Sequence, residues 1–452
     1  MTELPSNSDT STGAGTGTGT GTSILANANL APNMPRQPLR SLDAALAELI
    51  ALVLPLDEIE LVSTFDADGR VLAADLVSPL QVPPQDNSAM DGYAVRSADV
   101  QEPGTVLQVT QRIAAGSVGK PLGPFSAARI FTGAPIPPGA NAVVMQEDCV
   151  VVNDCEGGVR VNASPEPGQW IRRAGEDITQ GVVVLSKGER LAPQSCGLAA
   201  SIGMATVPVV RRVRVALFST GDELVMPGAV APGDMKPGAI YNSNRFFLRA
   251  LLLRLGCEVT DLGIVPDRLD ATVNALRGAA QTHDLVLTSG GVSVGEEDHV
   301  KPAVQQLGTL ALWQIAIKPG KPFAYGNLKT HPRACHFIGL PGNPVSSFVT
   351  FLVLVRPFLL RLQGMSANNA LNAFASKTVA ARADFIWPRA DKRREFLRVR
   401  RNANGGLDLF ANQSSGVLTS AVWGDGLVDN PAGNAIEFGD TVRFISFAEL
   451  LA

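Results

Sequence analysis

Histidines are rare in this sequence, and its cysteines are few and scattered. The 4 histidines among 452 residues show no spacing typical of a transition-metal site. The 5 cysteines form no CxxC pair, which argues against a disulfide framework and a structural zinc site. We interpret them as reduced core cysteines of a cytosolic protein. They are Cys149, Cys155, Cys196, Cys257 and Cys335.

The sequence also lacks a basic charge excess and a long uninterrupted hydrophobic run. Its net charge of -4 argues against a nucleic-acid-binding protein. The longest apolar stretch, Phe348 to Leu360, is interrupted by Arg356 and Pro357, which argues against a membrane span. The apolar fraction of 45% is enough to build hydrophobic cores. We therefore predict a soluble cytoplasmic protein.

The first part of the chain differs in composition from the rest. Thr12 to Thr22 is almost entirely glycine and threonine, so it can bury little apolar surface to offset its backbone entropy. No positively charged region followed by an apolar one is present, so this segment is not a secretory signal. We predict that residues 1–37 form a disordered tail.

The pattern of the next 170 or so residues predicts a helix followed by short strands. Ser41 to Val53 has apolar residues at helical spacing, with Ser41 as a possible cap. Leu80 to Tyr93 is broken by prolines, and Val106 to Val161 contains short β-runs between glycines and prolines. These features predict a small β-rich domain, followed by a short helix at Ser195 to Ile202.

From Val213 onward, strands alternate with helices. The predicted strands are Val213–Phe218, Glu258–Ile264, Asp284–Thr288 and Cys335–Leu340, and the predicted helices are Asn244–Leu255, Asp270–Gln281 and Pro344–Leu362. This alternation predicts a mainly parallel sheet with helices on both faces, where ligands bind beyond the carboxyl ends of the strands. Residues 365–452 read as short strands and turns, and we predict a β-barrel-like domain there.

Glycine-rich turns follow three of the predicted strands. They are Ser219–Leu224, Ser289–Asp298 and Gly339–Ser346. Glycines allow a ligand to approach the backbone, and consecutive N–H groups form an anion-binding nest. Asn343 can cap the last helix with Pro344 at its first position, so that the helix start presents unpaired N–H groups. An ordinary strand-to-helix turn explains any one of them, but three at one sheet edge favour an anion site.

Charged residues lie close to these turns. Lys318 and Lys321 flank a glycine turn after the β-run Ala311–Ile317, and ammonium groups suit phosphate or oxyanion ligands. Glu223, Asp267 and Asp298 follow strand ends, where carboxylates beside phosphates can hold Mg²⁺. A solvated surface turn for the lysines, and capping or turn roles for the carboxylates, are the alternatives.

Six motifs, taken in order, resemble one known family. They are Asp86-Asn-Ser-Ala-Met-Asp-Gly-Tyr93, Phe131-Thr-Gly-Ala-Pro135, Ser219-Thr-Gly-Asp-Glu223, Ser289-Gly-Gly-Val-Ser-Val-Gly295, Lys318-Pro-Gly-Lys-Pro322 and Gly339-Leu-Pro-Gly-Asn-Pro344. This set resembles the molybdopterin molybdenumtransferases, the MoeA and gephyrin E-domain family. The resemblance covers about residues 38–452 and leaves only the tail outside.

The resemblance implies four subdomains in an elongated, L-shaped protomer of a homodimer. A split linking domain would comprise 38–79 and 168–210, and a β-rich domain, 80–167, would be inserted within it. A molybdopterin-binding α/β domain, 211–364, and a β-barrel-like domain, 365–452, would follow. The implied reaction exchanges molybdate oxygen for the two dithiolene sulfurs of adenylylated molybdopterin and releases AMP. It requires Mg²⁺.

The resemblance also implies roles for individual residues. Asp267 and Asp298 would hold Mg²⁺ and the phosphoanhydride, with Glu223 contributing to the acidic part of the site. Asp86 and Thr132 would reach the site from the β-rich domain of the partner subunit. The substrate-binding residues would be Ser289, Gly290, Gly291, Ser293, Lys318, Gly320, Lys321, Pro322, Pro341, Asn343, Arg398 and Ser415. His299 stands where many relatives have an aromatic residue, which bears on local packing.

Two other functions remain open on the sequence. A molybdopterin adenylyltransferase would use the same type of α/β domain, although this chain has one copy of it. A scaffold, as in the receptor-clustering relatives, could lose Glu223, Asp267 and Asp298, and all three are present. Molybdopterin adenylyltransferase and molybdoenzymes are the further partners that the resemblance implies, and we predict neither a nucleic acid nor a membrane as partner.

Overall fold

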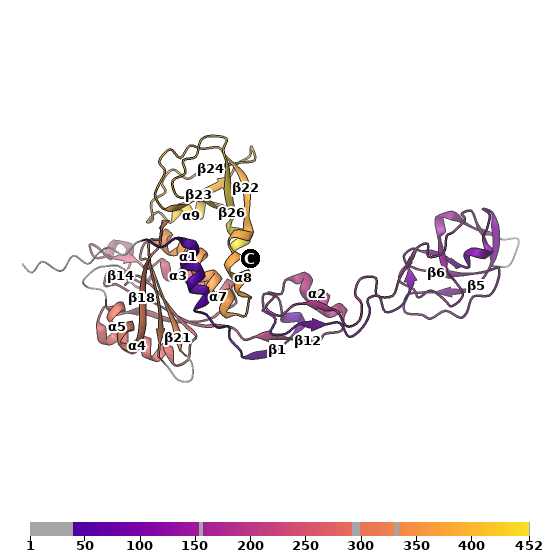
Figure 1. Cartoon of the computed structure of the whole chain (residues 1–452), viewed down its shortest axis with the longest axis horizontal. Helices are drawn as coiled ribbons and strands as arrows, with labels where there is room; N and C mark the ends of the chain where they lie inside the picture. The colour runs from indigo at the N-terminus through magenta and orange to yellow at the C-terminus, as the bar shows by residue number, and fades with distance from the viewer. Residues whose placement is uncertain (1–38, 153–156, 292–298, 330–333, 452) are drawn as a thin grey trace, which may run out of the picture. The chain divides into compact units, whose positions relative to one another are not determined.

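The middle of the chain contains a six-stranded sheet with the order β16-β13-β17-β21-β20-β18 (Figure 1). The computed structural model describes residues 39–152, 157–291, 299–329 and 334–451, so the predicted tail lies outside the described residues. The first four strands are parallel, and β20 and β18 add an antiparallel edge, which confirms a mainly parallel sheet. The strands are β13 (Arg214–Thr220), β16 (Glu258–Val265), β17 (Leu285–Ser289), β18 (Gly308–Gln314), β20 (Pro322–Leu328) and β21 (Cys335–Leu340).

Both faces of this sheet are covered by helices, as predicted. Alternate residues of β13 point to opposite sides: Val215 and Leu217 belong to one hydrophobic cluster, and Ala216 and Phe218 to the other. The first cluster includes helices α1 (Leu42–Ala51), α3 (Asn244–Arg254), α6 (Pro344–Thr350) and α7 (Arg356–Leu362). The second includes α4 (Leu269–Ala280) and α5 (Val300–Leu307).

The helix ends follow local sequence signals. The Ser41 hydroxyl accepts a hydrogen bond from the Ala44 N–H at 3.2 Å, which confirms the predicted cap of α1. Gly256 follows the end of α3 with φ +77°, a conformation that favours glycine.

The long helix predicted at Pro344–Leu362 is continuous but not uniform. A π-helical segment, η5 (Phe351–Val355), separates α6 from α7. Within the described residues, this stretch alone is long and apolar enough to cross a membrane, yet most of it is buried inside the protein. Burial of that kind is typical of the core helix of a soluble domain.

The last part of the chain forms a closed barrel, which confirms the predicted β-barrel-like domain. Strand β23 pairs with both β24 and β25, so the sheet β19-β23-β24-β22-β26-β25 closes on itself. Its strands are β19 (Ile317–Lys318), β22 (Thr378–Ala383), β23 (Arg394–Arg401), β24 (Gly406–Leu409), β25 (Gly426–Asn430) and β26 (Thr441–Ser446). Helices α8 (Ala367–Asn372), α9 (Thr419–Trp423) and α10 (Phe447–Leu451) accompany it. The predicted run Ala311–Ile317 is therefore divided, because Ile317 belongs to the barrel strand β19.

Segments far apart in the sequence pair in the N-terminal region. Strand β1 (Ile59–Ser63) pairs with β12 (Thr206–Val210), and β2 (Leu76–Val77) pairs with β11 (Val183–Leu185), beside helix α2 (Pro193–Ser201). The part of the sequence between β2 and β11 forms a second six-stranded sheet, with the strand order β7-β4-β6-β5-β9-β8. Its strands are β4 (Gly92–Val95), β5 (Thr105–Ile113), β6 (Ser126–Ile130), β7 (Ala142–Met145), β8 (Cys149–Val152) and β9 (Gly158–Val161). Two short strands, β3 (Asn87–Ser88) and β10 (Ile171–Arg172), pair with each other.

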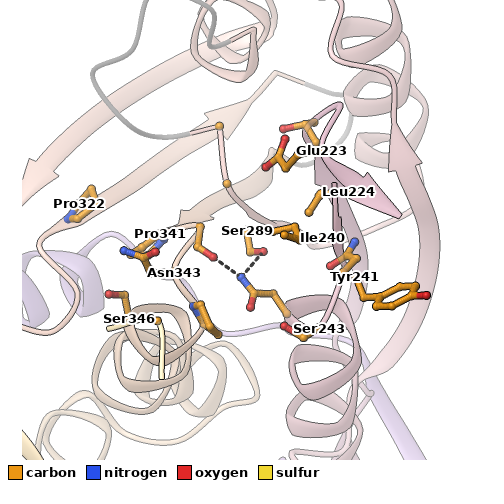
Figure 2. Close-up of a pocket in the computed structure, with 18 residues that line it drawn as sticks. Glu223, Leu224, Ile240, Tyr241, Ser243, Ser289, Pro322, Pro341, Asn343 and Ser346 are labelled. Atoms are coloured by element: carbon orange, nitrogen blue, oxygen red, sulfur yellow. Dashed lines mark hydrogen bonds between the residues drawn. The ribbon is translucent and has the colours of Figure 1, made fainter. Parts of the chain in front are cut away.

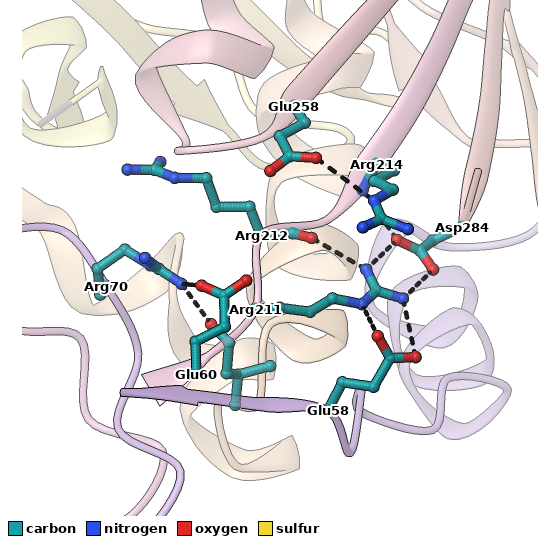
Figure 3. Close-up of polar contacts among 9 residues, drawn as sticks. Glu58, Glu60, Arg70, Arg211, Arg212, Arg214, Glu258 and Asp284 are labelled. Carbon is teal, nitrogen blue, oxygen red and sulfur yellow. Dashed lines mark hydrogen bonds and ion pairs between the residues drawn. The ribbon is translucent and has the colours of Figure 1, made fainter. Parts of the chain in front are cut away.

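Arg211 connects the N-terminal region to the α/β sheet (Figure 3). This side chain is buried, and its guanidinium donates to both carboxylate oxygens of Asp284, at 2.7 and 2.8 Å, and to Glu58. The hydrogen bonds to Asp284 are the main reason that the pKa of Arg211 is raised. Arg214 and Glu258 form a neighbouring pair at 3.4 Å, but both side chains are more than half exposed.

Replacing Arg211 with methionine is expected to lower the free energy of unfolding by about 2–4 kcal/mol. The variant leaves the nearly buried carboxylate of Asp284 without its bidentate partner, although the backbone N–H of Arg214 still donates to it. Arg214→Met is the matched control, and a loss below about 1 kcal/mol is expected because its ion pair is exposed. Denaturant unfolding measures both, and equal losses would contradict the assignment of Arg211 as the stabilising contact.

Candidate active site

A cavity of about 700 Å³ lies where the carboxyl ends of β13, β17 and β21 meet (Figure 2). All three glycine-rich turns contribute to its lining, as the alternation of strands and helices predicts. The paired strands β14 (Leu224–Val225) and β15 (Ile240–Tyr241) form another wall. The predicted site residues that line the cavity are Glu223, Ser289, Gly290, Gly291, Pro322, Pro341 and Asn343.

Asn244, which the sequence reasoning missed, joins two of these turns. Its side-chain amide donates to the Ser289 hydroxyl at 3.2 Å and to the Gly342 carbonyl at 2.7 Å (Figure 2). Asn244 is almost fully buried at the first turn of α3, and it lines the cavity. A polar residue at a helix start facing a sheet edge was the available signal, but helix capping explained it equally well.

The turn after β17 requires glycine for two physical reasons. Gly290 and Gly291 have φ values of +92° and +67°, which favour a residue without a side chain. A Cβ atom on Gly291 would also lie only 2.5 Å from a methyl group of Val300. Both glycines line the cavity, as expected for a segment that approaches a ligand closely. The predicted ligands Ser293 and Asp298 follow it but lie outside the described residues.

Two of the predicted magnesium ligands lie at neighbouring strand ends. Glu223 is exposed and lines the cavity, with its carboxylate folded over Gly221, where a Cβ atom would be 2.5 Å away. Asp267 is partly buried just after β16, the parallel neighbour of β13. Within the described part of the chain, no three His, Cys, Asp or Glu side chains cluster as a metal site. Mg²⁺ commonly uses only one or two carboxylates together with substrate phosphates, so these oxygen donors fit it.

The start of α6 differs from the prediction. Asn343 occupies the N-cap position and Pro344 follows it, but the Asn343 side chain makes no capping hydrogen bond. Its amide instead donates to the Ser415 hydroxyl at 3.1 Å, and the Val345 N–H donates to the Ser415 carbonyl at 2.9 Å. The predicted cap is therefore wrong, because Ser415 of the barrel domain competes for the same groups. Fewer N–H groups are left for an anion than the sequence suggested.

The lysine turn lies between the α/β sheet and the barrel. The Lys318 ammonium group is 2.9 Å from Glu395 and 3.3 Å from Asp391. Burial lowers the pKa of Lys318, but the hydrogen bonds and charges of Glu395 and Asp391 together outweigh it, so the net shift is upward. Lys321 is exposed, and Pro322 beside it lines the cavity. The two lysines thus differ in their surroundings, since Lys318 is paired with two carboxylates and Lys321 is exposed to solvent.

Arg398 does not line the cavity, although Gly416 of the same domain does. Its side chain is only 1% exposed and donates to the Ser420 hydroxyl and to the carbonyls of Phe396 and Ser414. Burial lowers the pKa of Arg398 to about 10. The guanidinium is therefore engaged by the barrel itself, and its assignment as a molybdate ligand stays a prediction.

The two predicted residues from the β-rich domain do not line the cavity either. Asp86 accepts hydrogen bonds from the Ala174 N–H at 2.9 Å and from Arg173 at 2.6 Å. The Ala174 bond is the largest cause of the lowered pKa of Asp86. Thr132 donates through both its N–H and its hydroxyl to Asp91, at 2.8 and 2.7 Å. Among the described residues of this chain, Asp86 and Thr132 are not brought together with the α/β motifs.

Family comparisons match almost the whole described chain. Residues 40–203 match the MoeA N-terminal region (domains I and II), 216–361 match a probable molybdopterin binding domain, and 380–447 match the MoeA C-terminal region (domain IV). The molybdopterin molybdenumtransferase of Haemophilus influenzae is 44% identical over 72% of this chain and 78% of its own length. That of a Nostoc species is 38% identical over 74% of this chain and 77% of its own.

Solved structures show the same architecture. The molybdopterin biosynthesis MoeA protein of Pyrococcus horikoshii is 28% identical, with a TM-score of 0.77 over 91% of this chain and 100% of its own. The fold and its cavity thus define a multidomain enzyme built around a molybdopterin-binding domain. With relatives of this identity and coverage, the chain belongs to the molybdopterin molybdenumtransferase family.

Proposed function

We propose that this enzyme inserts molybdate into adenylylated molybdopterin and releases AMP, with Mg²⁺ as cofactor. The observation that carries the proposal is the convergence of three glycine-rich strand ends on one polar cavity beside a lysine turn. The exposed backbone at Gly290 and Gly291 suits the substrate phosphates. Names of relatives add support, since several are molybdopterin molybdenumtransferases.

The site divides into an acidic half and a cationic half in this proposal. Glu223, Asp267 and Asp298 would hold Mg²⁺, and the ion would neutralise charge on the phosphates. Lys321 and Lys318 would hold molybdate away from these carboxylates, which would repel it. The hydroxyl of Ser289, fixed by Asn244, would orient the substrate between the halves.

The direct test is incubation of the purified protein with adenylylated molybdopterin, Mg²⁺ and molybdate. Molybdate-dependent release of AMP together with formation of the cofactor is the expected result. An adenylyltransferase would instead consume ATP and molybdopterin without needing molybdate. A scaffold would do neither, and either outcome would reject the proposal.

Replacing Asp298 with asparagine is expected to weaken Mg²⁺ binding and slow AMP release far more than it weakens folding. An ion held by one or two carboxylates and substrate phosphates loses a formal charge when one carboxylate becomes an amide. A rightward shift of AMP release in a Mg²⁺ titration measures the effect, and thermal unfolding measures folding. Asp270→Asn is the control, since Asp270 is exposed on α4 and pairs with Arg268. A wild-type Mg²⁺ titration for Asp298→Asn would assign Asp298 to a turn role.

We also propose a homodimer in which each site uses residues of both chains. Asp86 and Thr132 do not line the cavity of their own chain, although both belong to the predicted site. In addition, Ile59, Leu61 and Phe65 are 60%, 74% and 97% exposed, an apolar group that suits a protein interface.

Mixing inactive Asp86→Asn protein with inactive Asp298→Asn protein is expected to restore part of the activity. Heterodimers would contain one site with both native residues, so random exchange would give about a quarter of the wild-type rate per site. Subunit exchange is verified with differently tagged chains. If exchange is complete and no activity returns, the sites are built within single chains.

A further inference from the structure

A second cavity, of about 620 Å³, lies away from the active site. Its wall combines residues just before and within α2, residues of α7, and residues around α8. None of its lining residues lines the active-site cavity, and none belongs to the predicted site. Its volume lies within the range of small-molecule sites, about 300–1,000 Å³.

The side chain that distinguishes this cavity is Arg356. It is the first residue of α7, directly after the π-helical segment, and it is only 5% exposed. Its guanidinium donates to the Ala373 carbonyl at 3.2 Å, while its buried Nε has no hydrogen-bond partner among the residues that the structure describes. Burial is the main cause that lowers the pKa of Arg356 to about 10, and the charge of Arg190 adds to it. A buried cation without a carboxylate partner is costly to keep.

A second guanidinium, that of Arg190, lines the same cavity. It donates to the carbonyls of Gly69 and Arg254, at 3.3 and 3.4 Å. With Lys377 the lining carries three cations, against the exposed carboxylates of Asp68 and Glu449, so the net charge is 3 − 2 = +1. Arg356 is buried and Arg190 is partly buried, whereas Lys377, Asp68 and Glu449 are all exposed, so the charge inside the cavity is positive and favours an anion there.

We propose that this cavity binds an organic oxyanion, with a phosphate or carboxylate head on an apolar body. The planar guanidinium of Arg356 would hold two oxygens of the head, which suits either group. Asn372, whose amide already donates to the Asn368 carbonyl at 3.0 Å, and Ser376 also line the cavity and would add donors. The apolar body would lie against Leu191, Pro193, Leu360 and Met365, which also line it.

Calorimetric titration of the full-length protein with phenyl phosphate and with benzoate tests this site. Saturable binding of at least one is expected, and the tighter one identifies the head group. Loss of a charged hydrogen-bond donor is worth about 1.5–3 kcal/mol, so Arg356→Met should weaken binding at least about tenfold. Arg356→Lys keeps the positive charge but not the planar guanidinium, so its affinity should lie between those of the wild type and Arg356→Met.

The active site also attracts phosphates, so it must be separated from this one. The titration repeated with Lys321→Ala should retain the Arg356-dependent binding. If Lys321→Ala removes all binding while Arg356→Met leaves it unchanged, the ligand occupies the active site and the proposal is overturned. Absence of any saturable binding to the wild type overturns it as well.

A second variant keeps the proposal testable if Arg356→Met does not fold. Asn372→Glu introduces a carboxylate at the wall of the cavity, where it would repel the ligand and pair with the cations. Binding should then weaken at least about tenfold, as for loss of a charged contact. Asn368→Glu is the control, because Asn368 is an exposed residue one turn away on α8 that does not line the cavity. Unchanged binding by Asn372→Glu, or equal losses in both variants, would reject the site.

Discussion

Replacing Gly320 with alanine should remove most of the insertion activity and lower the free energy of unfolding by about 2–4 kcal/mol. Gly320 lies between the two lysines of the turn and has a φ of +114°, which a residue with a side chain rarely adopts. A Cβ atom there would overlap the Thr350 hydroxyl, and it would approach the Ile317 side chain to 3.2 Å. Thr350 is fully buried in α6, so it cannot move away without disturbing the core.

The alanine would therefore displace the turn and with it Lys321 and Pro322. A misplacement of about 1 Å in a positioning group can cost about a hundredfold in rate. Gly416→Ala is the matched control, because Gly416 lines the same cavity but has no atom within 4 Å of a built Cβ. Its unfolding free energy should change by less than about 1 kcal/mol. Thermal unfolding and AMP release measure both variants, and a fully active Gly320→Ala protein would contradict the role of the turn.

Replacing Lys321 with alanine should raise the molybdate concentration needed for half-maximal insertion by at least about tenfold. Molybdate is a dianion, and loss of one charged hydrogen bond to it corresponds to about 1.5–3 kcal/mol. The affinity for the nucleotide substrate should change much less, since backbone N–H groups of the glycine-rich turns would also hold the phosphates, although the Gly290 N–H itself donates to the Leu340 carbonyl at 3.0 Å. Because Lys321 is exposed, the effect should shrink as salt rises.

Lys318 and Arg398 provide informative comparisons. Lys318→Ala would leave the buried carboxylate of Glu395 with one side-chain donor among the described residues, the Trp387 indole N–H, so stability should fall together with molybdate affinity. Arg398→Ala would remove the hydrogen bonds that the guanidinium donates to the Ser420 hydroxyl and to two backbone carbonyls inside the barrel. Insertion rate against molybdate concentration is measured for all three variants. If they keep the wild-type molybdate dependence but lose nucleotide binding, these residues hold phosphate, and the division of the site is wrong.

The sheet edge could be predicted because its signals are local. Buried strands such as β13 and β17 read as short apolar runs, and glycines mark the turns that follow. Parallel strands bring their carboxyl ends to one edge, so the sequence alone predicts that Glu223, Ser289 and Asn343 lie near one another. The cavity they line confirms that geometry.

The contacts that the sequence did not reveal depend on residues far apart in the chain. Ser415 accepts hydrogen bonds from the Asn343 amide and from the Val345 N–H at the start of α6, and it lies 72 residues after Asn343 in the sequence. Lys318 pairs with Glu395, which lies 77 residues further along the chain. Neither pairing leaves a periodic pattern, because each depends on how the barrel packs against the α/β domain. The burial of Arg398 could not be predicted for the same reason, since an arginine in a strand usually indicates an exposed face.

Strand β19 belongs to the turn that carries the lysines, yet its hydrogen-bonded neighbour is β23 of the barrel. The strands on either side of that turn, β18 and β20, pair with each other in the α/β sheet. One peptide segment is therefore hydrogen-bonded to the barrel through β19 and continuous with the α/β sheet through β18 and β20. A movement of either sheet would displace this segment. An oxyanion held at this segment would stiffen the joint between them, and slower amide exchange of β19 and β23 would be its signature.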